Sequence, residues 1–111
     1  MQQVQVRALS ALLKQWPGPR PPVLLDVREP WELALARLDI EGTPTVCIPM
    51  SEIVARVAEL DPEVPVLALC HHGMRSQQVA AFLEHQGYTS FNVSGGIDAW
   101  SLEVDASVPR Y

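Results

Sequence analysis

The sequence predicts an α/β fold in which a mostly parallel sheet of roughly five strands is flanked by helices on both faces. Two apolar runs, 23–27 and 66–69, lack a regular polar alternation, which is typical of strands covered on both sides. Amphipathic helical segments alternate with these runs through short connections, as in parallel sheets. The 111 residues suit one hydrophobic core, so we expect a single domain over 1–111, with its core at about 4–103 and an aperiodic tail at 104–111.

The spacing of apolar residues places the individual elements. Leu9, Leu12 and Leu13 recur with Trp16 at helical spacing, and Pro17 ends this first helix. The predicted helices cover residues 9–16, 30–38, 51–60 and 75–86, and a last helix starts near residue 96. The predicted strands cover residues 23–27, 45–48, 66–69 and 90–93.

Residue types that favour helix ends support these boundaries. Pro30 suits the first turn of a helix, and Ser51 suits the N-cap of the next one. Asp61-Pro62 ends the helix predicted over 51–60, and Gly87 ends the helix predicted over 75–86. Gly95-Gly96 opens the last helix, either as a simple strand-to-helix turn or as a source of backbone amides near the reactive site.

Composition and charge exclude several classes of partner. Thirteen Asp and Glu against eight Lys and Arg leave a net charge of −5, which argues against nucleic acid or an anionic membrane as a partner. No stretch approaches ~20 apolar residues, so we expect no membrane span. The first seven residues lack the order of a signal peptide, and two cysteines do not make a disulfide scaffold. We therefore expect a reducing, cytoplasmic setting.

The chemistry is expected in the loop Cys70-His71-His72-Gly73-Met74-Arg75-Ser76, which joins a buried strand to an amphipathic helix. Such a turn can point backbone amides inward, and the helix N-terminus adds partial positive charge, so Cys70 becomes a thiolate nucleophile. Gly73 allows the positive φ or close approach that a tight loop needs. Arg75 offers a charged fork for an oxyanion, and the two histidines can add charge or hydrogen bonds. The plainer interpretation is a structural cysteine followed by a solvated turn.

Three segments together resemble the signatures of one family. Asp26-Val27-Arg28-Glu29-Pro30-Trp31-Glu32 resembles its first signature, and the loop from Cys70 to Ser76 resembles its active-site loop. Gly95-Gly96-Ile97-Asp98-Ala99-Trp100 resembles its last signature. The order and spacing fit over nearly the whole chain. The sequence therefore resembles a single-domain rhodanese, which is a sulfurtransferase.

This resemblance implies a reaction and a set of binding residues. Cys70 would attack thiosulfate or a persulfide, carry the outer sulfur as a persulfide, and pass it to cyanide or a thiol in two half-reactions. The residues that would bind the donor are His71, His72, Gly73, Met74, Arg75 and Ser76. The resemblance implies no metal and no organic cofactor. A protein can be a sulfur partner, and the physiological donor and acceptor stay open.

Two other functions also stay open. Dual-specificity phosphatases of the same fold class resemble this loop, but they place five residues between Cys and Arg, whereas four separate Cys70 from Arg75 here. A smaller ring of amides fits a sulfur atom better than a phosphoryl group, which disfavours phosphatase or arsenate reductase chemistry. A catalytically silent rhodanese-like binding module is the second alternative, although such modules usually lack the cysteine.

The sequence departs from the family pattern at two places. Relatives that use thiosulfate often carry Arg or Lys after the cysteine, where this chain has His71 and His72; their partial charge weakens the case for a dianionic donor. Cys47 replaces a histidine that usually follows the first signature. It is expected either as a buried apolar residue or as a resolving thiol for Cys70, the latter only if their Cα atoms lie within ~7 Å.

Residues around the loop are expected to support it. Asp26 should accept hydrogen bonds that brace the loop, and Arg28 should pair with a nearby carboxylate. The nearby carboxylates are Glu29, Glu32 and Asp98. Trp31 and Trp100 are interpreted as packing aromatics near the rim of the loop. Three adjacent residues rarely direct their ligand atoms to one ion, so Cys70 and the two histidines predict no metal site.

Overall fold

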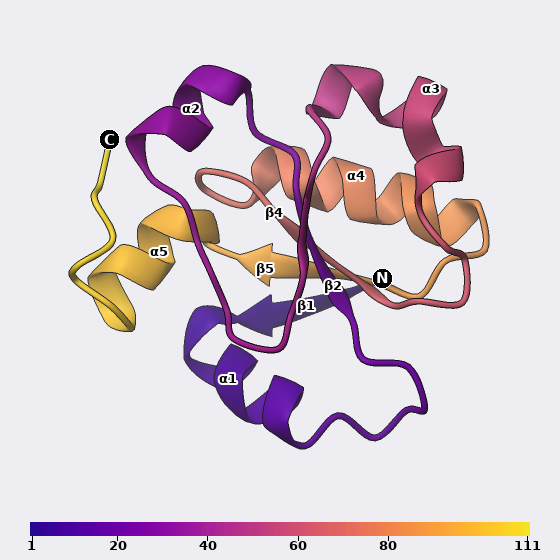
Figure 1. Ribbon diagram of the computed structural model, residues 1–111, viewed down its shortest axis with the longest axis horizontal. Helices are drawn as coiled ribbons and strands as arrows, with labels where there is room; N and C mark the ends of the chain where they lie inside the picture. Colours follow the sequence, from indigo (N-terminus) through magenta and orange to yellow (C-terminus); the bar gives the residue numbers. More distant parts are fainter.

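A computed structural model describes all 111 residues and contains one five-stranded sheet (Figure 1). The strands are β1 (Gln2–Gln5), β2 (Val23–Asp26), β3 (Thr45–Cys47), β4 (Val66–Leu69) and β5 (Ser90–Ser94). Their order across the sheet is β1-β5-β4-β2-β3, and all four neighbouring pairs are parallel. The predicted α/β class and parallel sheet are confirmed.

Helices cover both faces of the sheet. They are α1 (Val6–Lys14), α2 (Pro30–Leu35), α3 (Ile53–Arg56), α4 (Met74–His85) and α5 (Gly96–Glu103). Figure 1 shows α3 and α4 above the strands, α1 below them and α5 at the left. Side chains of α1 and α5 share one part of the core, and side chains of α3 and α4 share the other. The short helix α2 lies at the edge where the strands end, above the loop between β4 and α4 (Figure 1). This arrangement leaves the carboxyl ends of the central strands next to α2.

Successive residues of each strand point to opposite faces, which divides the core in two. The core under α1 and α5 contains Leu9, Leu24, Leu67, Ile97 and Trp100, together with other buried side chains. The core under α3 and α4 contains Leu25, Ile53, Val79, Leu83 and also Cys70. The β4 strand is buried at all four residues, which explains its uninterrupted apolar sequence.

Several predicted boundaries differ from the structure. The edge strand β1 was not predicted, because only Val4 of its four residues is buried and the segment has no apolar run. The first helix starts at Val6 and ends at Lys14, so Trp16 lies beyond it. The helix predicted over 51–60 is a short α-helix between two 3-10 turns, η1 (Met50–Glu52) and η2 (Val57–Glu59). The apolar spacing of this segment placed Val54 on its inner face, but Val54 is exposed.

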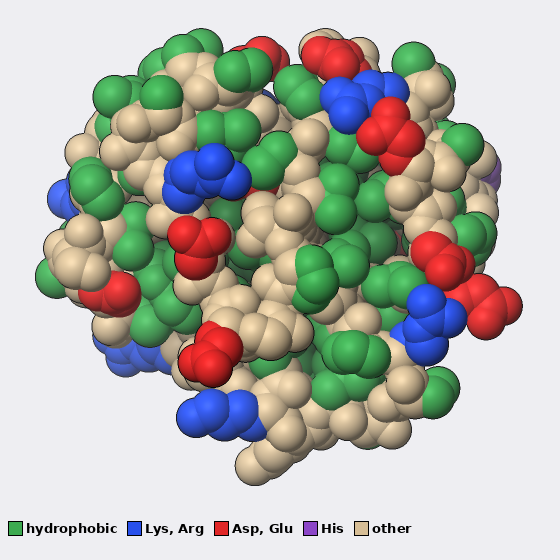
Figure 2. Space-filling view, viewed as in Figure 1, with side chains coloured by type: hydrophobic (Ala, Val, Ile, Leu, Met, Phe, Trp, Pro, Cys, Tyr) green, Lys and Arg blue, Asp and Glu red, His purple; other side chains and the backbone are tan.

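No helix of the chain is both long enough and apolar enough to cross a membrane. On the face seen in Figure 2, acidic and basic side chains lie beside one another in small groups among apolar ones, and no basic patch covers it.

Candidate active site

Cys70 directly follows the central strand β4, at the edge where parallel strands end. Its neighbour β2 ends at Asp26, and the chain order reverses between these two strands, since β3 lies beyond β2 and β5 beyond β4. Crevices at such reversal points are where ligands of open α/β sheets bind. The candidate site predicted from the sequence therefore lies at the position that this topology favours.

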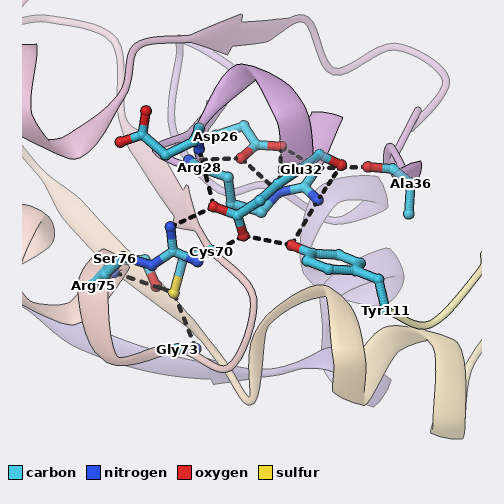
Figure 3. Close-up of polar contacts among 10 residues, drawn as sticks. Asp26, Arg28, Glu32, Ala36, Cys70, Gly73, Arg75, Ser76 and Tyr111 are labelled. Atoms are coloured by element: carbon cyan, nitrogen blue, oxygen red, sulfur yellow. Dashed lines mark hydrogen bonds and ion pairs between the residues drawn. The ribbon is translucent and has the colours of Figure 1, made fainter. Parts of the chain in front are cut away.

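The sulfur of Cys70 is enclosed by its own loop. The residue is 1% exposed, and two backbone amides donate to Sγ, from Gly73 at 3.1 Å and from Ser76 at 3.4 Å. The Ser76 hydroxyl lies 3.2 Å from Sγ (Figure 3). Four surface hollows of about 180 to 240 Å³ occur, and none is lined by a residue of the loop. The inward-pointing amides predicted for this loop are thus present, and they converge on the sulfur of Cys70.

Gly73 gives the loop its tight curvature. Its φ is +100°, a left-handed conformation that other residues avoid. A Cβ at Gly73 would also lie 2.9 Å from the backbone nitrogen of Gly95. Gly73 was expected to supply either a positive φ or a close backbone approach, and it supplies both.

The first turn of α5 holds the other side of the loop. The amides of Ile97 and Asp98 donate to the carbonyls of Cys70 at 2.9 Å and His71 at 3.1 Å. A Cβ at Gly96 would collide with these same two carbonyls. Gly95 and Gly96 thus form the strand-to-helix turn, and the amides that follow them orient the loop rather than the reacting sulfur.

Arg75 does not present a free fork to a substrate. Its Nη1 and Nη2 donate to Oε1 and Oε2 of Glu32 at 2.7 and 2.8 Å (Figure 3). Glu32 projects from α2, is 2% exposed, and also accepts from the backbone amide of Glu29. The bond to Arg75 lowers the pKa of Glu32 to about 2, so the carboxylate is ionised. The expected oxyanion fork is already occupied by this ion pair, and Glu32 was not predicted as its partner.

Arg28 pairs with a different carboxylate from those expected. It is completely buried, and its Nε and Nη2 donate to Asp26 at 2.9 and 2.8 Å. The expected pairing with a nearby carboxylate is present, but the partner is Asp26 and not Glu29, Glu32 or Asp98, which were named as examples. The Asp26 carboxylate accepts only from Arg28, including its backbone amide, and not from the loop. Arg28 instead braces the C-terminal end of α2, where the carbonyl of Ala36 accepts from its Nη2 at 2.9 Å.

The tail returns to this network through Tyr111. Its hydroxyl donates to Oε2 of Glu32 at 2.7 Å and accepts from Nη1 of Arg28 at 3.0 Å (Figure 3). Its ring stacks on the ring of His71, with centroids 4.0 Å apart and planes 10° apart. Nothing in the aperiodic tail sequence indicated this contact. Tyr111 therefore links the buried ions at the end of β2 to the reactive loop.

The two histidines of the loop lie in different surroundings. Burial, and then the neighbouring His72, lower the pKa of His71, which favours the neutral imidazole. His72 is exposed and stacks on His71 with ring centroids 3.9 Å apart. Its Nε2 is 3.8 Å from Asp98, whose carboxylate also pairs with Arg110 at 2.8 Å. One ligand atom each of His71, His72 and Asp98 lies within 4.8 Å of the other two. The negative charge of Asp98 is already balanced by Arg110. The expected lack of a metal stays a prediction.

Asn92 is a member of the site that the sequence did not indicate. It lies in β5, is 1% exposed, and accepts a hydrogen bond from the Ser76 hydroxyl at 2.5 Å. Its amide nitrogen donates to the carbonyl of Gly73 at 3.1 Å. The available signal was a polar residue between the two apolar residues of the strand, Phe91 and Val93. Because buried polar groups need partners, that signal pointed to a contact but not to which one.

The remaining candidates separate clearly. Cys47 of β3 pairs with Asp26 of β2, and Asp26 pairs on its other side with Leu69 of β4, the residue before Cys70. Two strand spacings of ~4.8 Å therefore separate Cys47 from Leu69 by roughly 9.6 Å. A resolving disulfide would therefore need backbone movement. Trp100 is buried as predicted, whereas Trp31 is 63% exposed and its ring lies edge-on to the ring of Tyr111, so Trp31 is not a buried packing residue. Met74 is 77% exposed at the loop mouth.

Comparison with known proteins places this geometry in a family. Over 91 residues the chain is 42% identical to the Arabidopsis thaliana Rhodanese-like/PpiC domain-containing protein 12, chloroplastic, covering 79% of this chain but only 30% of that protein. Over 80 residues it is 36% identical to the putative sulfurtransferase YtwF of Bacillus subtilis, covering 72% of this chain and 74% of that one.

A solved structure shows the same likeness over the whole chain. The rhodanese-like domain protein from Staphylococcus aureus is similar with a TM-score of 0.76 and 26% identity, covering 100% of this chain and 99% of that chain. The sequence profile described as Rhodanese-like domain matches residues 9–103, which include β2, the Cys70 loop and α5. Since this match extends over most of the chain, and the fold agrees with it, the chain belongs to the Rhodanese-like domain family.

Proposed function

We propose that this protein is a sulfurtransferase that carries a sulfane sulfur on Cys70. The observation that supports the proposal most directly is the convergence of the Gly73 and Ser76 amides on Sγ at the start of α4. Amide donors and a helix N-terminus stabilise a thiolate, which is the nucleophilic form of cysteine. The relationship to a protein named as a putative sulfurtransferase adds to this support.

The donor we favour is a persulfide rather than thiosulfate. The Cys70 thiolate attacks the outer sulfur of R–S–SH, an Sγ–S bond forms, and the electron pair of the broken S–S bond leaves on R–S⁻. With thiosulfate the same attack expels sulfite, a dianion that needs cationic binding groups. The Arg75 guanidinium is paired with Glu32, His71 favours its neutral form, and the whole chain carries a net charge of −5. A less charged donor therefore meets less repulsion.

In the second half-reaction the persulfide passes its outer sulfur to cyanide or to a thiol, and the Cys70 thiolate is restored. The side chains of Met74 and Trp31 are exposed and provide apolar contact for an acceptor or for a protein sulfur partner. A reducing compartment such as the cytoplasm keeps both thiols of the chain free, and no metal or organic cofactor enters either step.

The test is mass spectrometry of the protein, intact and after digestion, following incubation with a low-molecular-weight persulfide. The expected result is one added sulfur atom, located on the peptide that contains Cys70 and removed by cyanide. Cys70→Ser should lose the added sulfur, whereas Cys47→Ser, the matched control, should retain it. A protein that never acquires the sulfur, with Cys70 intact, would instead be a silent binding module. Hydrolysis of an aryl phosphate by the same sample would support the phosphatase alternative.

A further inference from the structure

Buried polar contacts connect Cys70 to Asn92 of β5 through the hydroxyl of Ser76. Asn92 donates through Nδ2 to the carbonyl of Gly73 at 3.1 Å and to Oε1 of Gln3 at 2.9 Å. A backbone carbonyl can only accept, so the amide nitrogen must face Gly73 and the opposite amide orientation would place two oxygens together. The Oδ1 atom of Asn92 therefore faces the Ser76 hydroxyl, 2.5 Å away.

This orientation decides where the Ser76 hydroxyl hydrogen lies. Asn92 Oδ1 is an acceptor only, and a serine hydroxyl has one hydrogen. At 2.5 Å from Oδ1 and 3.2 Å from Cys70 Sγ, the hydroxyl donates to Asn92 and turns an oxygen lone pair toward the sulfur. Sγ then receives hydrogen bonds only from the backbone amides of Gly73 and Ser76.

We propose that Asn92 is a positioning residue that holds the Ser76 hydroxyl hydrogen away from Cys70, so that the thiolate is stabilised by backbone amides alone and stays strongly nucleophilic. Each hydrogen bond to a thiolate stabilises it and also lowers its intrinsic nucleophilicity. Keeping the Ser76 hydroxyl from donating to Sγ leaves a smaller fraction of Cys70 ionised, but the thiolate that forms attacks a sulfur donor faster. The proposal rests on Cys70 being the reacting thiol of the proposed function.

The charged and titratable groups around Cys70 stay the same when Asn92 or Ser76 is changed. They are the Arg75–Glu32 ion pair, the Asp26–Arg28 ion pair, Tyr111, His71, His72 and Asp98. None of them contacts Asn92, whose polar partners are Ser76, Gly73 and Gln3. A shift in the titration of Cys70 in these variants therefore reports the hydroxyl hydrogen.

The experiment measures the rate of Cys70 alkylation by iodoacetamide against pH, in a Cys47→Ser background so that one thiol titrates. Asn92→Leu removes the acceptor at similar volume and frees the Ser76 hydroxyl to donate to Sγ. The midpoint of the curve of alkylation rate against pH should fall by about one pH unit in Asn92→Leu. The rate constant at the high-pH plateau of that curve should fall about threefold, because a thiolate of lower pKa is less nucleophilic. In a Ser76→Ala background, Asn92→Leu should cause no shift.

Ser76→Ala alone gives an independent answer if Asn92→Leu does not fold. The proposal expects no rise of the midpoint, because the hydroxyl donates nothing to Sγ. A rise of about one pH unit in Ser76→Ala, or an unchanged or higher midpoint in folded Asn92→Leu, would overturn it. Ser90→Ala is the matched control, since this buried serine of β5 donates to Ala80 of α4, and it should leave the midpoint unchanged. Alkylation needs no sulfur donor, so this result is separate from the failure or success of sulfur transfer.

Discussion

The guanidinium of Arg75 and the carboxylate of Glu32 form a two-pronged ion pair at 2.7 and 2.8 Å, although 43 residues separate them in sequence. The pair connects the start of α4 to α2, directly beside the Cys70 loop (Figure 3). Tyr111 adds a hydrogen bond to the same carboxylate from the end of the chain. The charge expected to bind an anionic donor is therefore balanced within the protein.

Replacing Glu32 with Gln should increase thiosulfate use. The uncompensated charge of Arg75 would then attract the dianion, and we expect kcat/KM for thiosulfate to rise by about tenfold, while that for a neutral persulfide changes little. Gln also preserves the hydrogen bond to the Glu29 amide. Steady-state kinetics with both donors measure the effect.

Glu59→Gln is the matched control, because it removes an equal charge from an exposed two-pronged pair with Arg56. An equal rise in this control would assign the effect to net charge instead of to Arg75.

Glu32 should also make stability depend on acid pH. Its pKa is about 2 in the folded protein against an ordinary value of 4.5, so the unfolded chain binds more protons between these values. The stabilisation by Glu32 is fully present above pH 4.5 and is lost as the pH falls toward 2. The difference in free energy of unfolding between wild type and Glu32→Gln should therefore narrow over this window. Urea denaturation at several pH values measures it, and a constant difference would contradict the prediction.

Tyr111 should contribute separately through its hydroxyl and through its ring. Tyr111→Phe removes a donor to Glu32 and an acceptor for Arg28, and we expect a loss of about 1 to 3 kcal/mol in the free energy of unfolding. Its ring still covers His71. Tyr111→Ala also removes the ring, so the burial that lowers the pKa of His71 decreases and that pKa should rise.

NMR titration of the His71 ring distinguishes these two variants. The pKa of His71 should stay unchanged in Tyr111→Phe and rise in Tyr111→Ala. Equal values in both variants would show that the ring does not shield the imidazole.

Gly73→Ala should disrupt the loop more than its backbone conformation alone requires. The added Cβ would lie 2.9 Å from the nitrogen of Gly95, a backbone atom that cannot move aside easily. Gly87→Ala is a closely matched control, because Gly87 has φ +95° and nothing within 4 Å of the added Cβ. Both variants carry the left-handed cost of about 1 kcal/mol, and Gly73→Ala should lose roughly 1 to 3 kcal/mol more.

The rate of Cys70 alkylation should fall only in Gly73→Ala, because the Gly73 amide is a donor to Sγ. Thermal unfolding and alkylation kinetics measure the two effects. Equal destabilisation of both variants would mean that the approach to Gly95 is unimportant.

The parallel sheet and the reactive loop were predictable because both depend on residues close together in sequence. The unbroken apolar run of β4 required burial on both faces, and Gly73 before a helical pattern required a tight turn. Cys70 was found by the same local signals. The edge strand β1 was missed because a strand with one buried residue has no hydrophobic period.

Local sequence determined that a cysteine stands between a buried strand and a helix, since side-chain volume, backbone freedom and apolar spacing act over a few residues. The tertiary structure decided which groups surround its sulfur. Glu32, Asn92 and Tyr111 come from three distant elements, and each has a polar or ionisable group that burial forces to find a partner. Several partners satisfy that requirement equally well in sequence, and only the packed chain selects one of them.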